Sequence, residues 1–215
     1  MNRFVLWFVK ITGLPLQHFY YKKKVYYESE NSPRKIKGSA LIVSNHTDVF
    51  DYPLIMYTFL SRNIYTLIAK ETMEKSWLMD CFLKALGGIK VERKNYNFSF
   101  LLEMINKLKK GEVGLVFPES RIPLEHERND FLPFKPSYVY LALESNSPII
   151  PIYTNGIYGK LKKKNKSHAK IIVGDYIYPN ELISDERSEK ENIDYINNYV
   201  KNYIQKLKDK MGSGQ

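Results

Sequence analysis

The sequence predicts an α/β domain with a mostly parallel central sheet that helices cover on both faces, preceded by an N-terminal amphipathic helical segment. Short apolar strands alternate with helices along the chain, and strands such as Ala40–Ser44 have the continuous apolar character of strands buried on both faces. The chain has 215 residues, of which 44% are hydrophobic, and this length suits a single domain of ordinary size.

The first 24 residues are expected to form a helical segment at a membrane interface. Gly13 and Pro15 divide it into two apolar groups, and the second group, Phe19–Tyr21, leads into Lys22–Lys24. Aromatic rings beside lysines are typical of the boundary between lipid and water. The alternative is a helix packed on the core. The first apolar group consists of Phe4, Leu6, Trp7, Phe8, Ile11 and Leu14.

Residues 25–211 are expected to form the main domain, and residues 212–215 a flexible tail. The helices of the main domain are predicted from apolar residues at helical spacing and from glycines that end them. The expected strands are Ala40–Ser44, Ile64–Ala69, Ile89–Glu92, Val113–Phe117, Ile149–Tyr153 and Lys170–Gly174. The expected helices are Pro53–Leu60, Thr72–Leu86, Phe98–Leu108, Pro136–Leu143 and Ile193–Met211.

Composition restricts the class of partner. The net charge of +10 favours an anionic partner, such as nucleic acid, anionic lipid or a phosphorylated substrate. The alternative is a solvated lysine-rich surface without such a partner. The single cysteine, Cys81, excludes an internal disulfide framework and a thiolate zinc site. We find neither an apolar run of about 20 residues nor a cleavable signal, so we expect a cytoplasmic protein that is peripheral on the inner face of the membrane.

The first candidate site follows the strand Ala40–Ser44. His46 is the histidine that comes at the end of a buried strand, which is where open α/β sheets place their active sites. Asp51 lies five residues later, a spacing that suits a turn between strand and helix. There, Asp51 can accept a hydrogen bond from one ring nitrogen of His46, and the other nitrogen can take a proton.

The same residues have other interpretations. Asp48 or Asp51 can cap the helix that Pro53 opens, and Asn45 and Thr47 can be turn residues. A metal site is a further alternative, which we rank last because no second histidine lies nearby.

The ends of the next strands carry charged residues. Lys70 follows Ile64–Ala69, Arg93 follows the strand after Gly87 and Gly88, and Glu119 and Arg121 follow Val113–Phe117. Guanidinium groups are natural ligands of phosphate. Basic groups repeated at one edge of a sheet indicate a pocket for an anionic substrate.

These segments resemble, in order, the motifs of the glycerolipid acyltransferase family, which includes the lysophosphatidic acid acyltransferases. Asn45, His46 and Asp51 are similar to its NHxxxxD motif, and residues 86–93 to its glycine–strand–arginine block. Phe117–Ile122 resembles FPEGTR, and Pro148–Ile152 resembles a PIVPV-like strand. The resemblance covers roughly residues 38–156. A lone HxxxxD pattern is weak, whereas four ordered motifs are specific.

Two residues depart from the family pattern. Ser120 stands where FPEGTR has glycine, and Ser137 stands where an FKxG segment has glycine. Glycine permits a close backbone approach and a positive φ. A serine is therefore costly at either position if one of these properties is required there.

The resemblance implies transfer of a fatty acyl group from acyl-CoA or acyl-carrier protein to the hydroxyl of a lysophospholipid such as 1-acyl-glycerol-3-phosphate, in phospholipid biosynthesis. His46 is then the general base and Asp51 its partner. Arg93, Arg121 and Lys70 hold the acceptor phosphate, and Glu119 orients an arginine or the acceptor hydroxyl. The reaction requires no metal and no cofactor beyond the acyl thioester co-substrate.

Two other function classes compete with this interpretation. One is a non-catalytic lipid- or phosphate-binding protein of the same fold, against which the intact His46–Asp51 pair argues. The other is a nucleic-acid-binding domain, which requires lysines and aromatic residues interleaved on one surface. The basic residues here instead follow strand ends beside the His46–Asp51 pair, which argues against nucleic acid. The expected partners are the lysophospholipid acceptor, the acyl thioester donor and, from the N-terminal segment, an anionic membrane surface.

Overall fold

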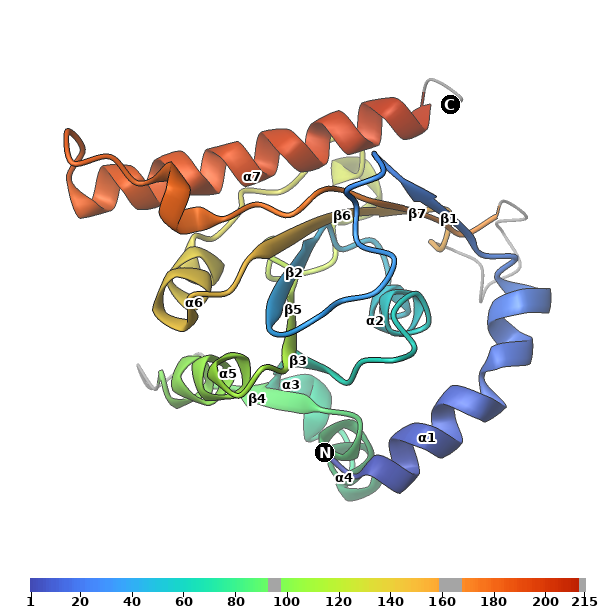
Figure 1. The fold of residues 1–215 in the computed structure, drawn as a ribbon. Coiled ribbons are helices and arrows are strands. Elements are labelled where there is room, and N and C mark those ends of the chain that lie inside the picture. The colour runs from blue at the N-terminus through green and yellow to red at the C-terminus, as the bar shows by residue number, and fades with distance from the viewer. Residues whose placement is uncertain (93–97, 159–167, 213–215) are drawn as a thin grey trace.

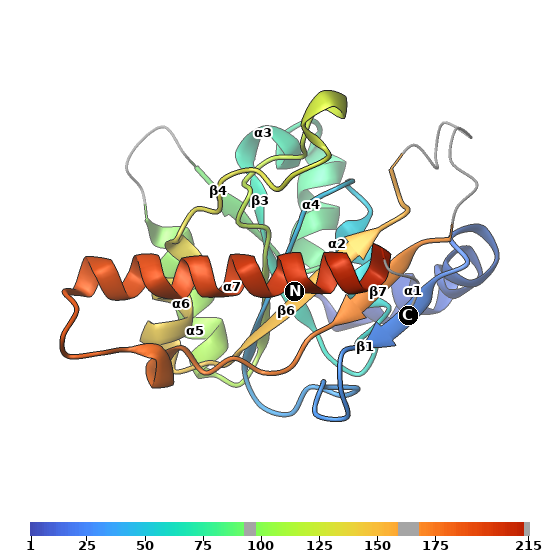
Figure 2. The same cartoon turned by 90° about the horizontal axis from the view of Figure 1, so that it is seen from above.

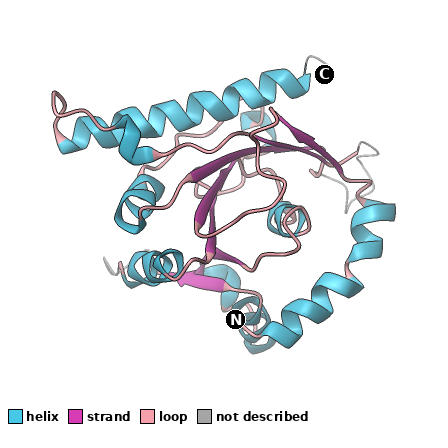
Figure 3. Cartoon of the chain, in the orientation of Figure 1, coloured by secondary structure: helices cyan, strands magenta, loops and turns pink. Residues whose placement is uncertain are grey.

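The computed structural model describes residues 1–92, 98–158 and 168–212. It confirms the α/β fold with a mostly parallel, seven-stranded sheet (Figures 1 and 3). The strands are β1 (Lys24–Tyr27), β2 (Ala40–Ser44), β3 (Ile64–Ala69), β4 (Gly88–Val91), β5 (Val113–Val116), β6 (Ile149–Asn155) and β7 (Lys170–Val173). The α-helices are α1 (Arg3–Thr12), α2 (Asp51–Met56), α3 (Lys70–Met73), α4 (Trp77–Ala85), α5 (Ser99–Lys109), α6 (Ser137–Ser145) and α7 (Glu189–Gly212). Shorter helical turns are η1 (Leu16–Tyr20), η2 (Glu125–Glu127) and η3 (Pro179–Leu182).

The strand order places β2 near the centre of the sheet. The order is β1-β7-β6-β2-β5-β3-β4, and the pairs among β6, β2, β5, β3 and β4 are all parallel. Only the β6–β7 pair is antiparallel among the strands that the structure describes. As a result, β2, β3, β4 and β5 end at the same edge of the sheet.

Alternating side chains of β2 divide the core into two layers. Leu41 and Val43 pack with α5, α6 and α7 on one face, whereas Ala40 and Ile42 pack with α2 on the other. Both sets are fully buried, as expected for a central parallel strand. Figure 1 shows α5, α6 and α7 on one side of the sheet and α1 and α2 on the other.

Several predicted boundaries differ from the observed ones. The predicted helix Thr72–Leu86 is two helices, because Ser76 leaves helical geometry and its side chain accepts a hydrogen bond from Met79 N–H, which caps α4. The predicted helix Pro53–Leu60 begins and ends earlier, at Asp51 and Met56. Strand β1, which begins at Lys24 and pairs with β7, is not among the strands predicted from the sequence, and the expected boundary after residue 24 falls within it. Helix α7 extends to Gly212, and the remaining tail residues lie outside the described ones.

The N-terminal segment packs one face on the domain and leaves the other exposed. Leu6 packs with Met56, Tyr57 and Leu86, and Tyr21 is buried in the core layer that contains α2. The outward stripe of α1 has the helical spacing i, i+3, i+4, i+7. It consists of Phe4, Trp7, Phe8 and Ile11, whose exposed fractions are 71%, 58%, 54% and 48%.

Polar contacts attach this segment to α2 and the turn that follows it. The Lys10 ammonium donates to the carbonyl oxygens of Leu60 and Arg62 at 2.8 and 2.7 Å. The Lys23 ammonium donates to Tyr57 O at 2.8 Å, and burial lowers the pKa of Lys23 to about 8. Lys23 therefore faces the protein, unlike Lys22 and Lys24, which are exposed. None of the helices in the described ranges is long and apolar enough to cross a bilayer.

These contacts predict that Leu6 contributes to stability whereas the outward stripe does not. Replacing Leu6 with alanine should lower the free energy of unfolding by about 2–5 kcal/mol, because it leaves a cavity between α1 and α2. The matched control is Phe4→Ala on the same helix, which should change it by less than about 0.5 kcal/mol. Urea denaturation measures both variants. Equal effects would mean that α1 does not pack on the domain as described.

Candidate active site

The candidate site lies where β2 ends, in the turn formed by residues 45–50. The parallel register brings the ends of β3 and β5 to the same edge, with Lys70 after β3 and Glu119 after β5. Seen from above, the segment after β5 and helix α3 lie together at one edge of the sheet (Figure 2). The structure thus brings charged residues to one edge, as the strand-end pattern predicts.

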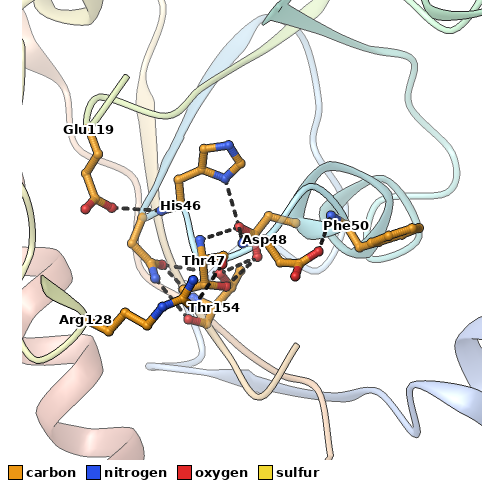
Figure 4. Close-up of polar contacts among 9 residues, drawn as sticks. His46, Thr47, Asp48, Phe50, Glu119, Arg128 and Thr154 are labelled. Atoms are coloured by element: carbon orange, nitrogen blue, oxygen red, sulfur yellow. Dashed lines mark hydrogen bonds and ion pairs between the residues drawn. The ribbon is translucent and has the colours of Figure 1, made fainter. Parts of the chain in front are cut away.

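Asp51 is the polar centre of this turn and is fully buried. Its Oδ2 accepts hydrogen bonds from the backbone N–H groups of Thr47 and Asp48 at 2.6 and 2.8 Å, and lies 3.0 Å from His46 Nδ1. Its Oδ1 accepts from the hydroxyls of Thr47 and Thr154 at 3.0 and 3.1 Å. The carboxylate therefore closes the turn and orients the imidazole at the same time (Figure 4). Asp48 has the lesser role of accepting from Phe50 N–H.

The His46 ring is fixed from two sides. Its Nδ1 faces Asp51, and its plane stacks on the Phe117 ring with centroids 4.2 Å apart and an interplanar angle of 14°. Within the described residues no hydrogen bond reaches Nε2, and the side chain is 19% exposed. A carboxylate at Nδ1 favours the tautomer that carries its proton there, which leaves the lone pair of Nε2 available to accept a proton.

Asn45 and Thr154 connect the turn to β6, a role that the sequence analysis did not assign to either residue. The Asn45 amide donates to Thr154 O at 3.0 Å, and its carbonyl oxygen accepts from Thr154 N–H at 2.8 Å. The Thr154 hydroxyl reaches Asp51. These contacts join segments 109 residues apart, so neither spacing nor periodicity in the sequence indicates them.

The hydrogen-bond partners of Glu119 differ from the expected ones. The sequence predicts that Glu119 orients an arginine or the acceptor hydroxyl; in the structure its two carboxylate oxygens accept from the backbone N–H groups of His46 and Leu132 at 2.8 and 2.9 Å. Burial raises its pKa, and the two N–H donors act in the opposite direction. Glu119 therefore holds the backbone of His46 against the segment after β5.

The two serines at family glycine positions differ in conformation. Ser120 has a φ of +63°, the left-handed region in which glycine is favoured, whereas Ser137 begins α6 with no positive φ. The requirement for a positive φ therefore applies to Ser120 and not to Ser137.

Two of the three cationic residues expected to bind phosphate, Arg121 and Lys70, have internal carboxylate partners. The Arg121 guanidinium makes two 2.6 Å hydrogen bonds to Glu127 and lowers the pKa of Glu127 to about 2. The Lys70 ammonium lies 2.6 Å from a carboxylate oxygen of Glu92. The third of these residues, Arg93, lies outside the described residues.

The structure adds one cationic residue to the site. The Arg128 guanidinium lies over the Tyr158 ring, 3.1 Å from its centroid, and donates to Thr47 O at 3.4 Å. Figure 4 shows it reaching toward the turn that carries His46 and Asp48. Arg128 does not directly follow a strand, so the pattern of charged residues at strand ends does not indicate it.

A cavity of about 420 Å³ lies between β4 and α5, away from His46. Glu92, the carboxylate partner of Lys70, lines this cavity together with Lys84, Lys90 and Lys107. Across the described ranges, no group of three or more His, Cys, Asp or Glu side chains converges in a way that suits a metal ion.

Fold and site together define an α/β protein with a His–Asp pair at the edge of its mostly parallel sheet. The chain belongs to the acyltransferase family, whose model matches residues 24–155. It is 24% identical over 152 residues to the 1-acyl-sn-glycerol-3-phosphate acyltransferase of Bacillus subtilis (strain 168), covering 71% of this chain and 72% of that protein. Its fold is similar to the crystal structure of the 1-acyl-sn-glycerophosphate acyltransferase PlsC from Thermotoga maritima. The TM-score is 0.66 at 22% identity, over 96% of this chain and 80% of the other.

The conformation of Ser120 predicts that glycine stabilises this position. Ser120→Gly should raise the free energy of unfolding by roughly 0.5–1 kcal/mol. A left-handed residue with a side chain costs about 1–2 kcal/mol, and the greater freedom of glycine in the unfolded chain offsets part of it. Ser137→Gly is the matched control and should give no gain. Chemical denaturation of both variants measures the difference, and a gain at residue 137 but not at 120 would contradict it.

Proposed function

We propose that this acyltransferase moves a fatty acyl group from an acyl thioester, acyl-CoA or acyl-carrier protein, to the hydroxyl of a lysophospholipid such as 1-acyl-glycerol-3-phosphate, in phospholipid biosynthesis. The observation that carries the proposal is the contact of His46 Nδ1 with the buried Asp51 carboxylate, 3.0 Å away. Family membership supports acyl transfer, and the similarity to two 1-acylglycerol-3-phosphate acyltransferases favours this acceptor.

In the proposed reaction, His46 Nε2 takes the proton of the acceptor hydroxyl as its oxygen attacks the thioester carbonyl carbon. Asp51 stabilises the imidazolium that forms and keeps the ring oriented. When the tetrahedral intermediate collapses, the carbon–sulfur bond breaks and the imidazolium returns its proton to the leaving thiol. The products are the ester and the free thiol, so the step is balanced without a redox partner.

We assign the acceptor phosphate to Arg121, together with Lys70 and Arg93. A phosphate dianion matches the bidentate geometry with which Arg121 binds Glu127. Arg121 is half exposed, so solvent weakens its pair with Glu127, and a doubly charged ligand can replace the carboxylate. Glu127 then acts as a competitor of the phosphate.

We further propose that the N-terminal segment, residues 1–24, lies at an anionic membrane surface. The outward stripe of α1 supports this, since aromatic and aliphatic side chains there have no cover from the described part of the chain. Lys22 and Lys24 are exposed beside the aromatic residues of η1, where they can meet lipid phosphates.

The role of His46 predicts a specific loss of turnover. His46→Ala should lower kcat for acyl transfer by at least about 10²-fold, which is the usual contribution of a general base. Asp51 keeps its hydrogen bonds to Thr47, Asp48 and Thr154, so the fold should remain. Free thiol released from acyl-CoA in the presence of lysophosphatidic acid measures turnover, and thermal melting checks the fold.

The control for this variant is His126→Ala, which removes an exposed histidine from η2 and should leave turnover unchanged. A folded His46→Ala protein that keeps more than a tenth of the kcat would exclude the general-base role. Absence of thiol release from the wild-type protein would favour the alternative of a non-catalytic lipid- or phosphate-binding protein.

The competition between Glu127 and phosphate predicts that substitutions of Arg121 and Glu127 change the KM for the acceptor in opposite directions. Arg121→Ala should raise the KM for lysophosphatidic acid roughly tenfold to a hundredfold, as expected for a lost charge-assisted bond, without a comparable change in the KM for the thioester. Glu127→Gln should lower the KM for the same acceptor. Glu125→Gln, in the same short helix, is the control. Steady-state kinetics with each substrate varied separately measures the effects, and equal changes for both substrates would indicate a structural role.

A further inference from the structure

Helix α4 displays its apolar side chains and turns a charged one inward. Trp77 and Leu78 are 76% and 70% exposed, and Phe82 and Cys81 are also exposed on the same helix. No residue of α4 is fully buried. A surface helix normally buries its apolar stripe and exposes its charges, so this arrangement is the reverse of the usual one.

Asp80 explains how α4 is held in this orientation. Its side chain is 19% exposed, and it pairs with Lys84 of the same helix at 2.6 Å and with Lys90 of β4 at 3.5 Å. Lys90 also lies 2.8 Å from Glu74, in the turn between α3 and α4. This ion-pair group attaches the polar side of α4 to the edge of the sheet, which leaves the side with Trp77, Leu78 and Phe82 facing outward.

Helix α4 adjoins the start of α1, the helix that carries the outward apolar stripe. The backbone N–H of Asn2 donates to Ala85 O at 2.9 Å, so the first residues of α1 abut the last turn of α4. Figure 1 shows the two helices following one another along the lower margin of the molecule. Large apolar side chains that are exposed on two adjoining helices are a mark of an interaction site.

We propose that α4 is a second membrane-inserting element, which enters an anionic bilayer together with the N-terminal segment. This inference deepens the proposed function and rests on it. A lipid surface suits α4 because Trp77 and Phe82 are residues of the interfacial region, and the exposed Lys75 next to them can meet lipid phosphate.

The position of α4 relates the membrane to the catalytic edge. Helix α3 begins at Lys70, directly after β3, and α4 follows it in the chain, so α4 begins next to the helix that lies at the edge of the sheet carrying the site (Figure 2). Insertion of α4 in addition to α1 therefore brings this edge to the bilayer, where a lysophospholipid acceptor resides. Insertion of α1 alone does not fix that orientation.

The chain contains two tryptophans, one in each proposed element, and they separate the two proposals. Trp7→Phe leaves Trp77 as the single tryptophan, and Trp77→Phe leaves Trp7. Each variant is mixed with vesicles of phosphatidylglycerol and phosphatidylcholine, with and without bromine on the acyl chains. We expect a blue shift of the emission and quenching by the brominated lipid for both variants.

A charge placed on α4 provides the second measurement. Leu78→Glu should lower sedimentation with these vesicles several-fold, whereas Leu102→Glu, at a leucine of α5 that is 63% exposed outside this surface, should not. Both proteins should keep wild-type melting temperatures and turnover of a short-chain, water-soluble acceptor. Turnover of the water-soluble acceptor tests the catalytic proposal independently of membrane binding.

The outcomes differ for each idea. Quenching of Trp7 without quenching of Trp77 would overturn the role of α4 and leave the N-terminal proposal intact. Absence of quenching for both tryptophans would overturn both membrane proposals, while thiol release in solution would still support acyl transfer. A blue shift of Trp77 that grows with protein concentration in the absence of lipid would mean that a second copy of the chain covers α4, and would also overturn the inference.

Discussion

The geometry of the site depends on one buried carboxylate. Asp51 is inaccessible to solvent and accepts hydrogen bonds from two backbone N–H groups, two hydroxyls and the His46 ring. An ionised carboxylate out of contact with water is tolerated only when its oxygens are satisfied in this way. The turn after β2, the start of α2 and the end of β6 must therefore keep their positions relative to one another.

The parallel sheet supplies these positions. Because β6, β2 and β5 are neighbours with a common direction, Thr154, Asn45 and Glu119 all reach the same turn from their strand ends. Glu119 fixes the backbone of His46, and Asn45 fixes the turn to β6. The His46–Asp51 pair is thus supported by side chains whose partners lie more than 70 residues away in the sequence.

The same helix that begins with Asp51 also receives the N-terminal segment. Lys23 binds the carbonyl of Tyr57 just after α2, and Leu6 packs on Met56 within it. The outward side chains of α1 are apolar, and α4, which exposes Trp77 and Leu78, adjoins the first residues of α1. The helix that carries Asp51 therefore also holds the segment with the exposed apolar stripe.

The sequence by itself determined the fold class, most of the strands, the order of the motifs and the His46–Asp51 pair, because these are local patterns of apolar periodicity and short spacing. It also indicated that Ser120 occupies a position suited to glycine, which the φ of +63° bears out. Tertiary structure decided the contacts and orientations that short sequence patterns do not specify. These features are the Thr154–Asp51 contact, the attachment of Glu119 to the His46 backbone, the pairing of Arg121 with Glu127, the inward position of Lys23 and the reversed orientation of α4. Each depends on which strands are neighbours and on which side a helix meets the sheet, and these are properties of the packed chain rather than of any short segment.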